Sequence, residues 1–221
     1  MVSHFTVDLR VLELISSRLC HELIGPITGI STGIELASGG ENGADREILE
    51  LLGFSAAQAS ARLQFYRLAY GLGGSDDESV NLGQITRLCD GIVGETRVTC
   101  DWSAVGSLDA RMRKSDARLF LNLFVIACDS LPKGGTVSAR PSEQGARIVL
   151  EAAGEGAGLA EVVPAAFDGR VDVSTLTPRT VHPYFTACLF ERTGQTVKLS
   201  DRPGQPGFDF SLSKALAFGP E

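Results

Sequence analysis

His21 is the residue of this sequence best suited to chemistry by its type and its neighbours. Glu22 follows it directly, and Pro26 stands five residues after it. An exposed neutral imidazole is a nucleophile near pH 7, and an adjacent carboxylate can orient the ring or accept its proton. We therefore treat His21 as a candidate catalytic nucleophile and Glu22 as a candidate catalytic partner.

The residues around His21 have the periodicity of one long helix, predicted from about residue 6 to residue 37. Apolar side chains recur there at spacings of three and four, which is typical of a buried helix face. They are Leu12, Ile15, Leu19, Leu23, Ile27, Ile30 and Ile34. At 3.6 residues per turn, His21 lies roughly 200° from Leu19 and 160° from Leu23, so it points away from the apolar face.

A second helix is predicted from about residue 45 to residue 70, after a loop at 38–43 that contains three glycines. A two-helix hairpin cannot bury both of its apolar faces alone. Pairing with a second copy in a four-helix bundle would cover them. We expect a homodimer built from residues 1–73, with packing on the chain's own C-terminal half as the alternative.

Residues 74–221 have a different pattern, in which short helices alternate with strands. Helices are predicted at about 82–92, 116–131 and 183–192, and strands at 97–103, 136–140, 147–151, 196–200 and 208–213. This order indicates a mixed sheet with helices on one face. The predicted fold class is therefore α+β, with a helical hairpin followed by an α/β sandwich.

The pattern His-Glu-Leu-x-x-Pro at residues 21–26 resembles the H-box of histidine kinases and of the dimeric histidine phosphotransferases related to them. In those proteins the histidine carries a phosphoryl group on a ring nitrogen. The second half of the chain resembles the ATP-binding domain of the same kinases. Asn122 matches the first asparagine of their N-box, and residues 132–135 match the Pro-x-Gly-Gly turn that follows it.

Three nucleotide-binding features of the kinases are missing from this chain. Ile126 stands where the second N-box asparagine helps to hold magnesium, and Ala152 stands where an aspartate recognises adenine. The stretch 177–183 contains two prolines and no glycine, whereas the kinases have a glycine-rich lid. The chain therefore resembles the ChpT-type histidine phosphotransferases of alphaproteobacterial phosphorelays, with a degenerate kinase-like domain and no ATP-dependent kinase activity.

This resemblance implies a specific reaction and specific partners. His21 would receive a phosphoryl group from an aspartate in the receiver domain of a CckA-like hybrid histidine kinase. It would pass that group to the receivers of CtrA-like and CpdR-like response regulators, in cell-cycle regulation. The receiver would supply Mg²⁺, and this chain would bind no cofactor or metal.

The face of the first helix around His21 is the expected docking surface. In an antiparallel hairpin, one part of the second helix lies beside it. The candidate partner-binding residues are Ser17, Arg18, Ile24, Gly25, Thr28, Gln58, Arg62 and Phe65.

Gly25, Gly29 and Gly33 also lie in the first helix, although glycine in a helix interior is unfavourable. They indicate either a bare strip that admits a partner or close helix–helix packing, and the sequence leaves both open.

Composition excludes several classes of function. The formal net charge of −7 argues against nucleic acid and anionic membranes as main partners. No apolar run approaches the ~18 residues of a membrane-spanning helix, and the N-terminus lacks signal-peptide features. The five cysteines form no Cys-x-x-Cys pair, which favours reduced thiols and a cytoplasmic location.

Two other functions compete with phosphotransfer. An active ATP-dependent histidine kinase would need nucleotide ligands at Ile126 and Ala152. A non-catalytic dimeric adaptor would make His21 incidental. The sequence contains neither the ligand cluster of a metalloenzyme nor the nucleophile elbow of a hydrolase, so it does not indicate either class of enzyme.

Overall fold

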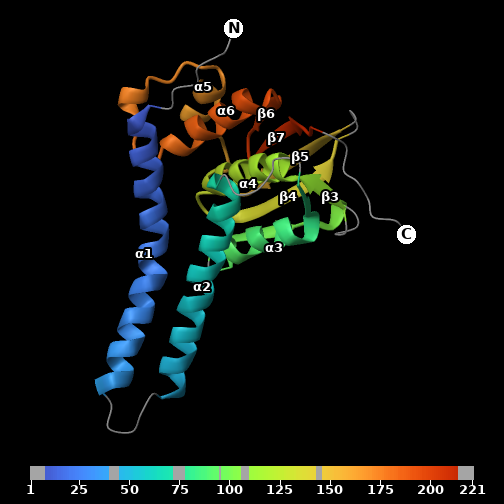
Figure 1. The fold of residues 1–221 in the computed structure, drawn as a ribbon. Coiled ribbons are helices and arrows are strands. Elements are labelled where there is room, and N and C mark those ends of the chain that lie inside the picture. The colour runs from blue at the N-terminus through green and yellow to red at the C-terminus, as the bar shows by residue number, and fades with distance from the viewer. Residues whose placement is uncertain are drawn as a thin grey trace.

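The computed structural model describes residues 8–39, 45–71, 78–94, 96–105, 110–142 and 146–213. Two long helices, α1 (Leu9–Gly39) and α2 (Arg46–Tyr70), form an antiparallel hairpin that projects from an α+β domain (Figure 1). The predicted hairpin is confirmed. Most of the loop predicted at 38–43 lies outside the described residues, and so does the predicted domain boundary after residue 73.

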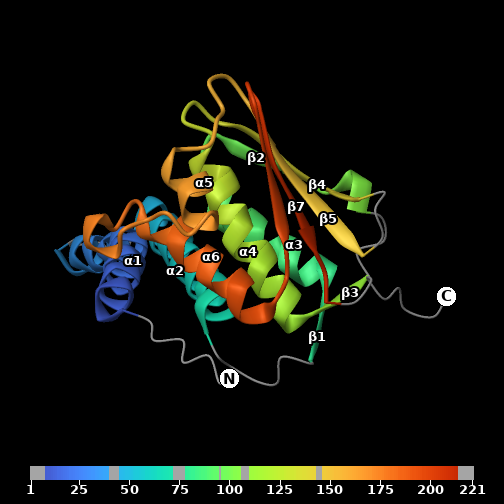
Figure 2. The ribbon, with the colours of Figure 1, turned by 90° about the horizontal axis from the view of Figure 1, so that it is seen from above.

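The second part of the chain is a layer of helices on a five-stranded sheet. The strand order is β2-β4-β5-β7-β6, with β2 and β4 parallel and the other pairs antiparallel. Helices α3, α4 and α6 lie on one face of this sheet (Figure 2). The strands are β2 (Val98–Asp101), β4 (Gly135–Pro141), β5 (Arg147–Ala153), β6 (Val197–Arg202) and β7 (Gln205–Ser211), and the helices are α3 (Leu82–Val93), α4 (Lys114–Asp129) and α6 (Val181–Thr193).

The predicted α+β class is confirmed, and the elements that the sequence did not predict are short. They are β1 (Ser79–Asn81), β3 (Arg111–Arg113), α5 (Val162–Phe167) and the two 3₁₀ turns η1 (Ser103–Val105) and η2 (Val173–Thr175). Segments of three to six residues are too short to establish a period of 3.6 or 2.

The main core lies between the sheet and α4. Every residue of α4 from Asp116 to Ala127 is buried, so this helix runs through the centre of the domain. In the central strands, fully buried side chains alternate with less buried ones, most of them polar, as in a sheet with one covered face. In β5, Ile148, Leu150 and Ala152 are fully buried, whereas Arg147 and Glu151 are only half-buried.

The last turn of α2 is bonded directly to α4. The final carbonyls of a helix have no partner within the helix and need donors from elsewhere. Arg118 Nε and Asn122 Nδ2 both donate to the Ala69 carbonyl, at 3.2 and 2.9 Å, and Arg118 Nη2 donates to the Tyr70 carbonyl at 3.0 Å. Two side chains of α4 therefore fix the hairpin on the domain.

A buried histidine extends this junction to α6. His182 Nε2 lies 3.0 Å from the Asn122 carbonyl, and its Nδ1 lies 3.1 Å from the Tyr70 hydroxyl. A carbonyl can only accept, so Nε2 carries the proton and Nδ1 accepts from the tyrosine. Burial, followed by the nearby positive charge of Arg18, lowers the pKa of His182 to about 3. The imidazole is therefore neutral at physiological pH.

The first helix has its own contacts with the domain. Arg18 Nη2 pairs with Asp129 Oδ2 at the end of α4, at 2.9 Å, and Arg10 Nη2 donates to the Leu176 carbonyl at 3.0 Å. Val11 and Ile15 pack in a small second core with Leu176 and Val181. Both helices of the hairpin are thus attached to the domain at the same end.

The apolar stripe of α1 is only partly covered within one chain. Leu12, Ile27 and Ile34 are 58%, 50% and 54% exposed, so the expectation of a buried face is not met by α2. The residues of α1 that pack on α2 are instead small ones, such as Gly29 and Gly33. Part of the stripe is therefore exposed in the single chain.

The depressed pKa of His182 predicts a specific pH dependence of stability. The unfolded chain binds a proton at this side chain below about pH 6.5, whereas the folded chain does not until about pH 3. The stabilisation is therefore complete above pH 6.5 and is lost as the pH falls below it. The free-energy difference between wild type and His182→Gln should shrink by about 2 kcal/mol from pH 7 to pH 5, as measured by urea unfolding. An unchanged difference would contradict a neutral buried imidazole.

Candidate functional site

His21 lies in the middle of α1 with its side chain exposed. Gly25 and Thr28, one and two turns further along the same face, are exposed as well, and Ile24 is 63% exposed. Ser17, one turn before, is half-buried. The structure therefore presents most of the predicted α1 face to solvent around the imidazole.

Pro26 lies inside α1 without ending it. Because proline has no N–H, the carbonyl of Glu22 lacks the donor that would normally stand four residues later. The Pro26 ring itself is buried. Burial of this ring therefore offsets part of the free energy that proline costs inside a helix, one turn after the imidazole.

Glu22 is directed toward α2. Its Oε2 lies 3.8 Å from Arg62 Nε, and Arg62 Nη1 donates to Gln58 Oε1 at 3.1 Å. Adjacent residues of a helix do not face each other, so Glu22 and His21 project in different directions from α1. The structure thus brings Glu22, Gln58 and Arg62 together, as the antiparallel placement predicted.

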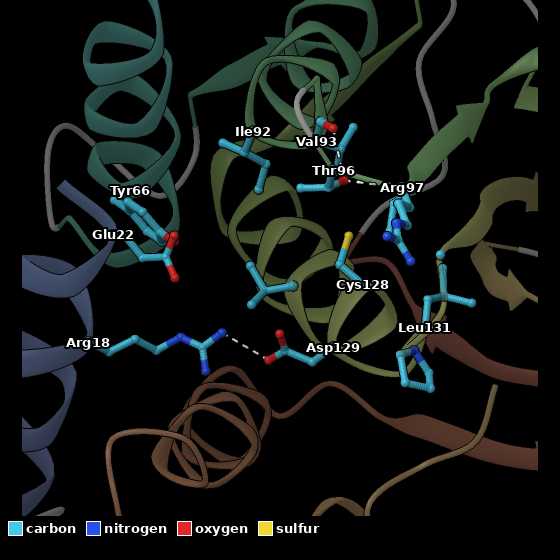
Figure 3. Close-up of a pocket in the computed structure, with 14 residues that line it drawn as sticks. Arg18, Glu22, Tyr66, Ile92, Val93, Thr96, Arg97, Cys128, Asp129 and Leu131 are labelled. Atoms are coloured by element: carbon cyan, nitrogen blue, oxygen red, sulfur yellow. Dashed lines mark hydrogen bonds and ion pairs between the residues drawn. The ribbon is translucent and has the colours of Figure 1, made fainter. Parts of the chain in front are cut away.

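A cleft of about 410 Å³ separates the hairpin from the domain beside Glu22 (Figure 3). Arg18, Glu22 and Tyr66 form one side, and Arg97 and Leu131 are among the residues of the opposite side. Burial and then the negative charge of Glu22 raise the pKa of Tyr66, which therefore stays protonated. The cleft combines a buried phenol with charged groups at its rim.

Arg18, predicted as a docking residue, is held inside the molecule. Its side chain is only 13% exposed because it spans from α1 to Asp129 at the cleft. Part of its charge is therefore offset before any partner arrives.

Phe65 was predicted as a docking residue, and this prediction is wrong. Its side chain is fully buried and packs edge-on against Tyr66 and at a tilt against Phe124 of α4. Placement by distance from the loop put Phe65 near His21 along the hairpin axis. It could not show that this side of α2 faces the domain core.

The three glycines of α1 fall into two groups. A Cβ added at Gly25 would meet nothing within 4 Å, whereas one added at Gly29 would lie 2.5 Å from Ser55 Oγ. A Cβ added at Gly33 would lie 2.7 Å from a methyl group of Leu52. Close packing on α2 therefore explains Gly29 and Gly33, and only Gly25 belongs to an open surface.

The other histidines offer no second accessible imidazole among the residues that the structure describes. His182 is fully buried, and His4 lies outside the described residues. Among the residues that the structure describes, no group of three or more His, Cys, Asp and Glu side chains is arranged to hold a metal ion. His21 is therefore the accessible imidazole in the described ranges.

The positions that kinases use for nucleotide are part of the core in this chain. Ile126 and Ala152 are 1% and 0% exposed, and Asn122 is bonded to the end of α2. Sequence reasoning found these substitutions but not the new role of Asn122. An N-box asparagine gives no sign of its partner in the sequence.

Residues 82–204, more than half of the chain, match the family described as "Histidine phosphotransferase C-terminal domain". The chain belongs to the histidine phosphotransferase family. This phosphotransferase is 29% identical over 201 residues to "Protein phosphotransferase ChpT" of Brucella abortus (strain 2308), covering 87% of this chain and 92% of that protein. The resemblance inferred from the H-box and the degenerate domain, to ChpT-type phosphotransferases, is confirmed.

One solved structure is similar over nearly the whole chain. The phosphotransferase is similar to "1.7 Angstrom Structure of a Bacterial Phosphotransferase", with a TM-score of 0.73 and 26% identity, covering 93% of this chain and 98% of that one. It is also similar to the catalytic domain of the histidine kinase ThkA, with a TM-score of 0.46 and 15% identity, over 62% of this chain and 95% of that one. In the described part of the phosphotransferase, no helix has the length and apolar character needed to cross a membrane.

Proposed function

We propose that this histidine phosphotransferase carries its phosphoryl group on His21, between the aspartates of two receiver domains. The observation that carries the proposal is the contrast between its two described histidines. His21 is exposed on a continuous helix, whereas His182 is buried with both ring nitrogens bonded. A receiver can approach only the first of these imidazoles.

The reaction needs little from the chain beyond a neutral imidazole and correct placement. The lone pair of one His21 ring nitrogen forms the P–N bond while the P–O bond to the receiver aspartate breaks. The electron pair of that bond leaves with the aspartate carboxylate, and the return reaction reverses these changes. Phosphoryl transfer of this kind depends on in-line positioning and charge neutralisation. Mg²⁺ on the receiver supplies the neutralisation, so this chain needs no cofactor.

The proposed partners follow from the ChpT relative. They are the receiver of a CckA-like hybrid kinase as donor, and CtrA-like and CpdR-like response regulators as acceptors. The proposed location is the cytoplasm, where such receivers are found. The exposed residues Ile24, Gly25 and Thr28 form the centre of the docking surface, and the half-buried Ser17 and Gln58 lie at its edges.

We also propose a homodimer through the hairpin. Leu12, Ile27 and Ile34 of α1 and Leu49 and Leu63 of α2 are each at least half exposed. At 100° per residue, Ile27 and Ile34 lie roughly 120–140° around α1 from His21. A second copy can therefore cover the apolar stripe and leave the imidazole free.

The first prediction of this proposal concerns labelling. Incubation with a phosphorylated receiver should give acid-labile label on the wild-type chain, and His21→Gln should accept none. Cys20→Ala, a change at the exposed neighbouring residue, should be labelled like wild type. Label on His21→Gln would refute the assignment, and an unlabelled wild type would favour an adaptor.

The second prediction concerns the oligomer. Light scattering at micromolar concentration should give about twice 23.4 kDa. Ile34→Glu should yield a monomer, because a charge in the apolar seam would have to be desolvated. Leu36→Glu is the matched control, since Leu36 is 53% exposed but lies roughly 200° around the helix from Ile34. A monomeric wild type would contradict the proposed bundle.

The third prediction separates docking from packing. Gly25→Leu should slow transfer by about tenfold, equivalent to ~1.4 kcal/mol, because the new side chain stands where the receiver must approach. Its melting temperature and dimer should be unchanged, since that position is open. Gly29→Leu should instead lower the melting temperature, because it meets Ser55. If Gly25→Leu unfolds or dissociates the dimer, Gly25 is a packing residue.

A further inference from the structure

We infer that Arg62 is a positioning residue, which supports phosphotransfer by holding and neutralising the carboxylate of Glu22. This inference rests on the proposed role of His21. It changes the expected role of Arg62 from a contact with the partner to a contact within the chain. It also changes the expected role of Glu22, which the structure turns away from the imidazole.

The geometry of Arg62 suits this role. Its side chain is 18% exposed and that of Glu22 is 38% exposed, so the pair is mostly covered by the two helices. Gln58, one turn earlier on α2, accepts from Arg62 Nη1 and holds the guanidinium in place. A side chain so enclosed and bonded has few atoms left for a partner protein. The structure gives it an internal partner instead, 3.8 Å away.

Charge explains why the reaction would need this pair. The phosphoryl group that approaches His21 is an anion, and Glu22 is the next residue on the helix. An unpaired carboxylate there would repel the phosphoryl group most strongly as it nears the imidazole. Arg62 offsets that charge from α2, at 3.8 Å from the Glu22 carboxylate.

The other nearby cation does not replace Arg62. Arg18 lies one turn before Glu22 on α1, but its guanidinium is bonded to Asp129 Oδ2 at 2.9 Å. Its positive charge is therefore already paired with a carboxylate of α4. Loss of Arg62 should leave Glu22 without a close counter-charge in the described contacts.

A double-mutant cycle tests the inference. Transfer from a phosphorylated receiver is measured over a range of receiver concentrations for wild type, Arg62→Met, Glu22→Gln and the double variant. Arg62→Lys tests whether a cation alone suffices. Arg46→Met is the matched control, because Arg46 forms an exposed ion pair with Glu50 on the same helix, far from His21.

The expected result is that Arg62→Met lowers the maximal transfer rate about tenfold, equivalent to ~1.4 kcal/mol. The half-saturating receiver concentration should change little, and Arg62→Lys should recover most of the rate. In the Glu22→Gln background, the same Arg62→Met change should have less than about a twofold effect, because no charge remains to be offset. Arg46→Met should behave as wild type.

Two results would overturn the inference. One is an equal loss from Arg62→Met in both backgrounds, which would mean that Arg62 acts without Glu22. The other is a change confined to the half-saturating concentration, which would make Arg62 a docking contact. Failure of wild type to accept label would instead refute the proposed function, so the two failures are distinguishable.

Discussion

The position of the hairpin on the domain depends on the hydrogen bonds that the last carbonyls of α2 accept. The last carbonyls of α2 must find donors outside the helix, and Arg118 and Asn122 of α4 supply them. These side chains come from α4, whose residues are buried from Asp116 to Ala127, so the position of α4 in the core fixes the direction in which the hairpin projects. The contacts of α1 with Asp129 and Leu176 then fix α1 relative to α2 and the domain. As a result, the surface around His21 has one fixed position relative to the domain.

The same junction involves residues of the domain that resembles the ATP-binding domain of histidine kinases. Asn122 keeps the residue type of an N-box, but its amide now bonds a backbone carbonyl of the hairpin. Ile126, one turn later, and Ala152 on β5 add apolar volume to the core. His182, from the stretch that replaces the lid, bonds Tyr70 of α2 and the Asn122 carbonyl. The residues that resemble nucleotide-binding positions of the kinases thus attach the hairpin to the domain or fill its interior.

The sequence predicted the elements well, and it predicted their contacts less well. Long helices and paired strands repeat their period often enough to be recognised, so α1, α2, α4 and the β4–β5 pair were all expected. Exposure of His21 also followed from helix geometry. The sequence could not show which side of α2 meets the domain, and Phe65 was therefore misplaced. Nor could it distinguish Gly25 from Gly29, because only the position of Ser55 on the facing helix separates them.

The charges beside His21 are compensated within the chain, and this leaves one side of α1 without charged residues around the imidazole. Arg18 and Glu22 lie one turn apart on the inner side of α1, and each meets an opposite charge, on α4 and α2 respectively. The outer side then carries His21 with Ile24, Gly25 and Thr28, none of which is a permanent charge. A protein with a net charge of −7 would repel an acidic receiver at long range. In the proposed complex, a small, uncharged surface around the imidazole would limit that repulsion where the two molecules touch, and recognition there would depend on shape and apolar contact.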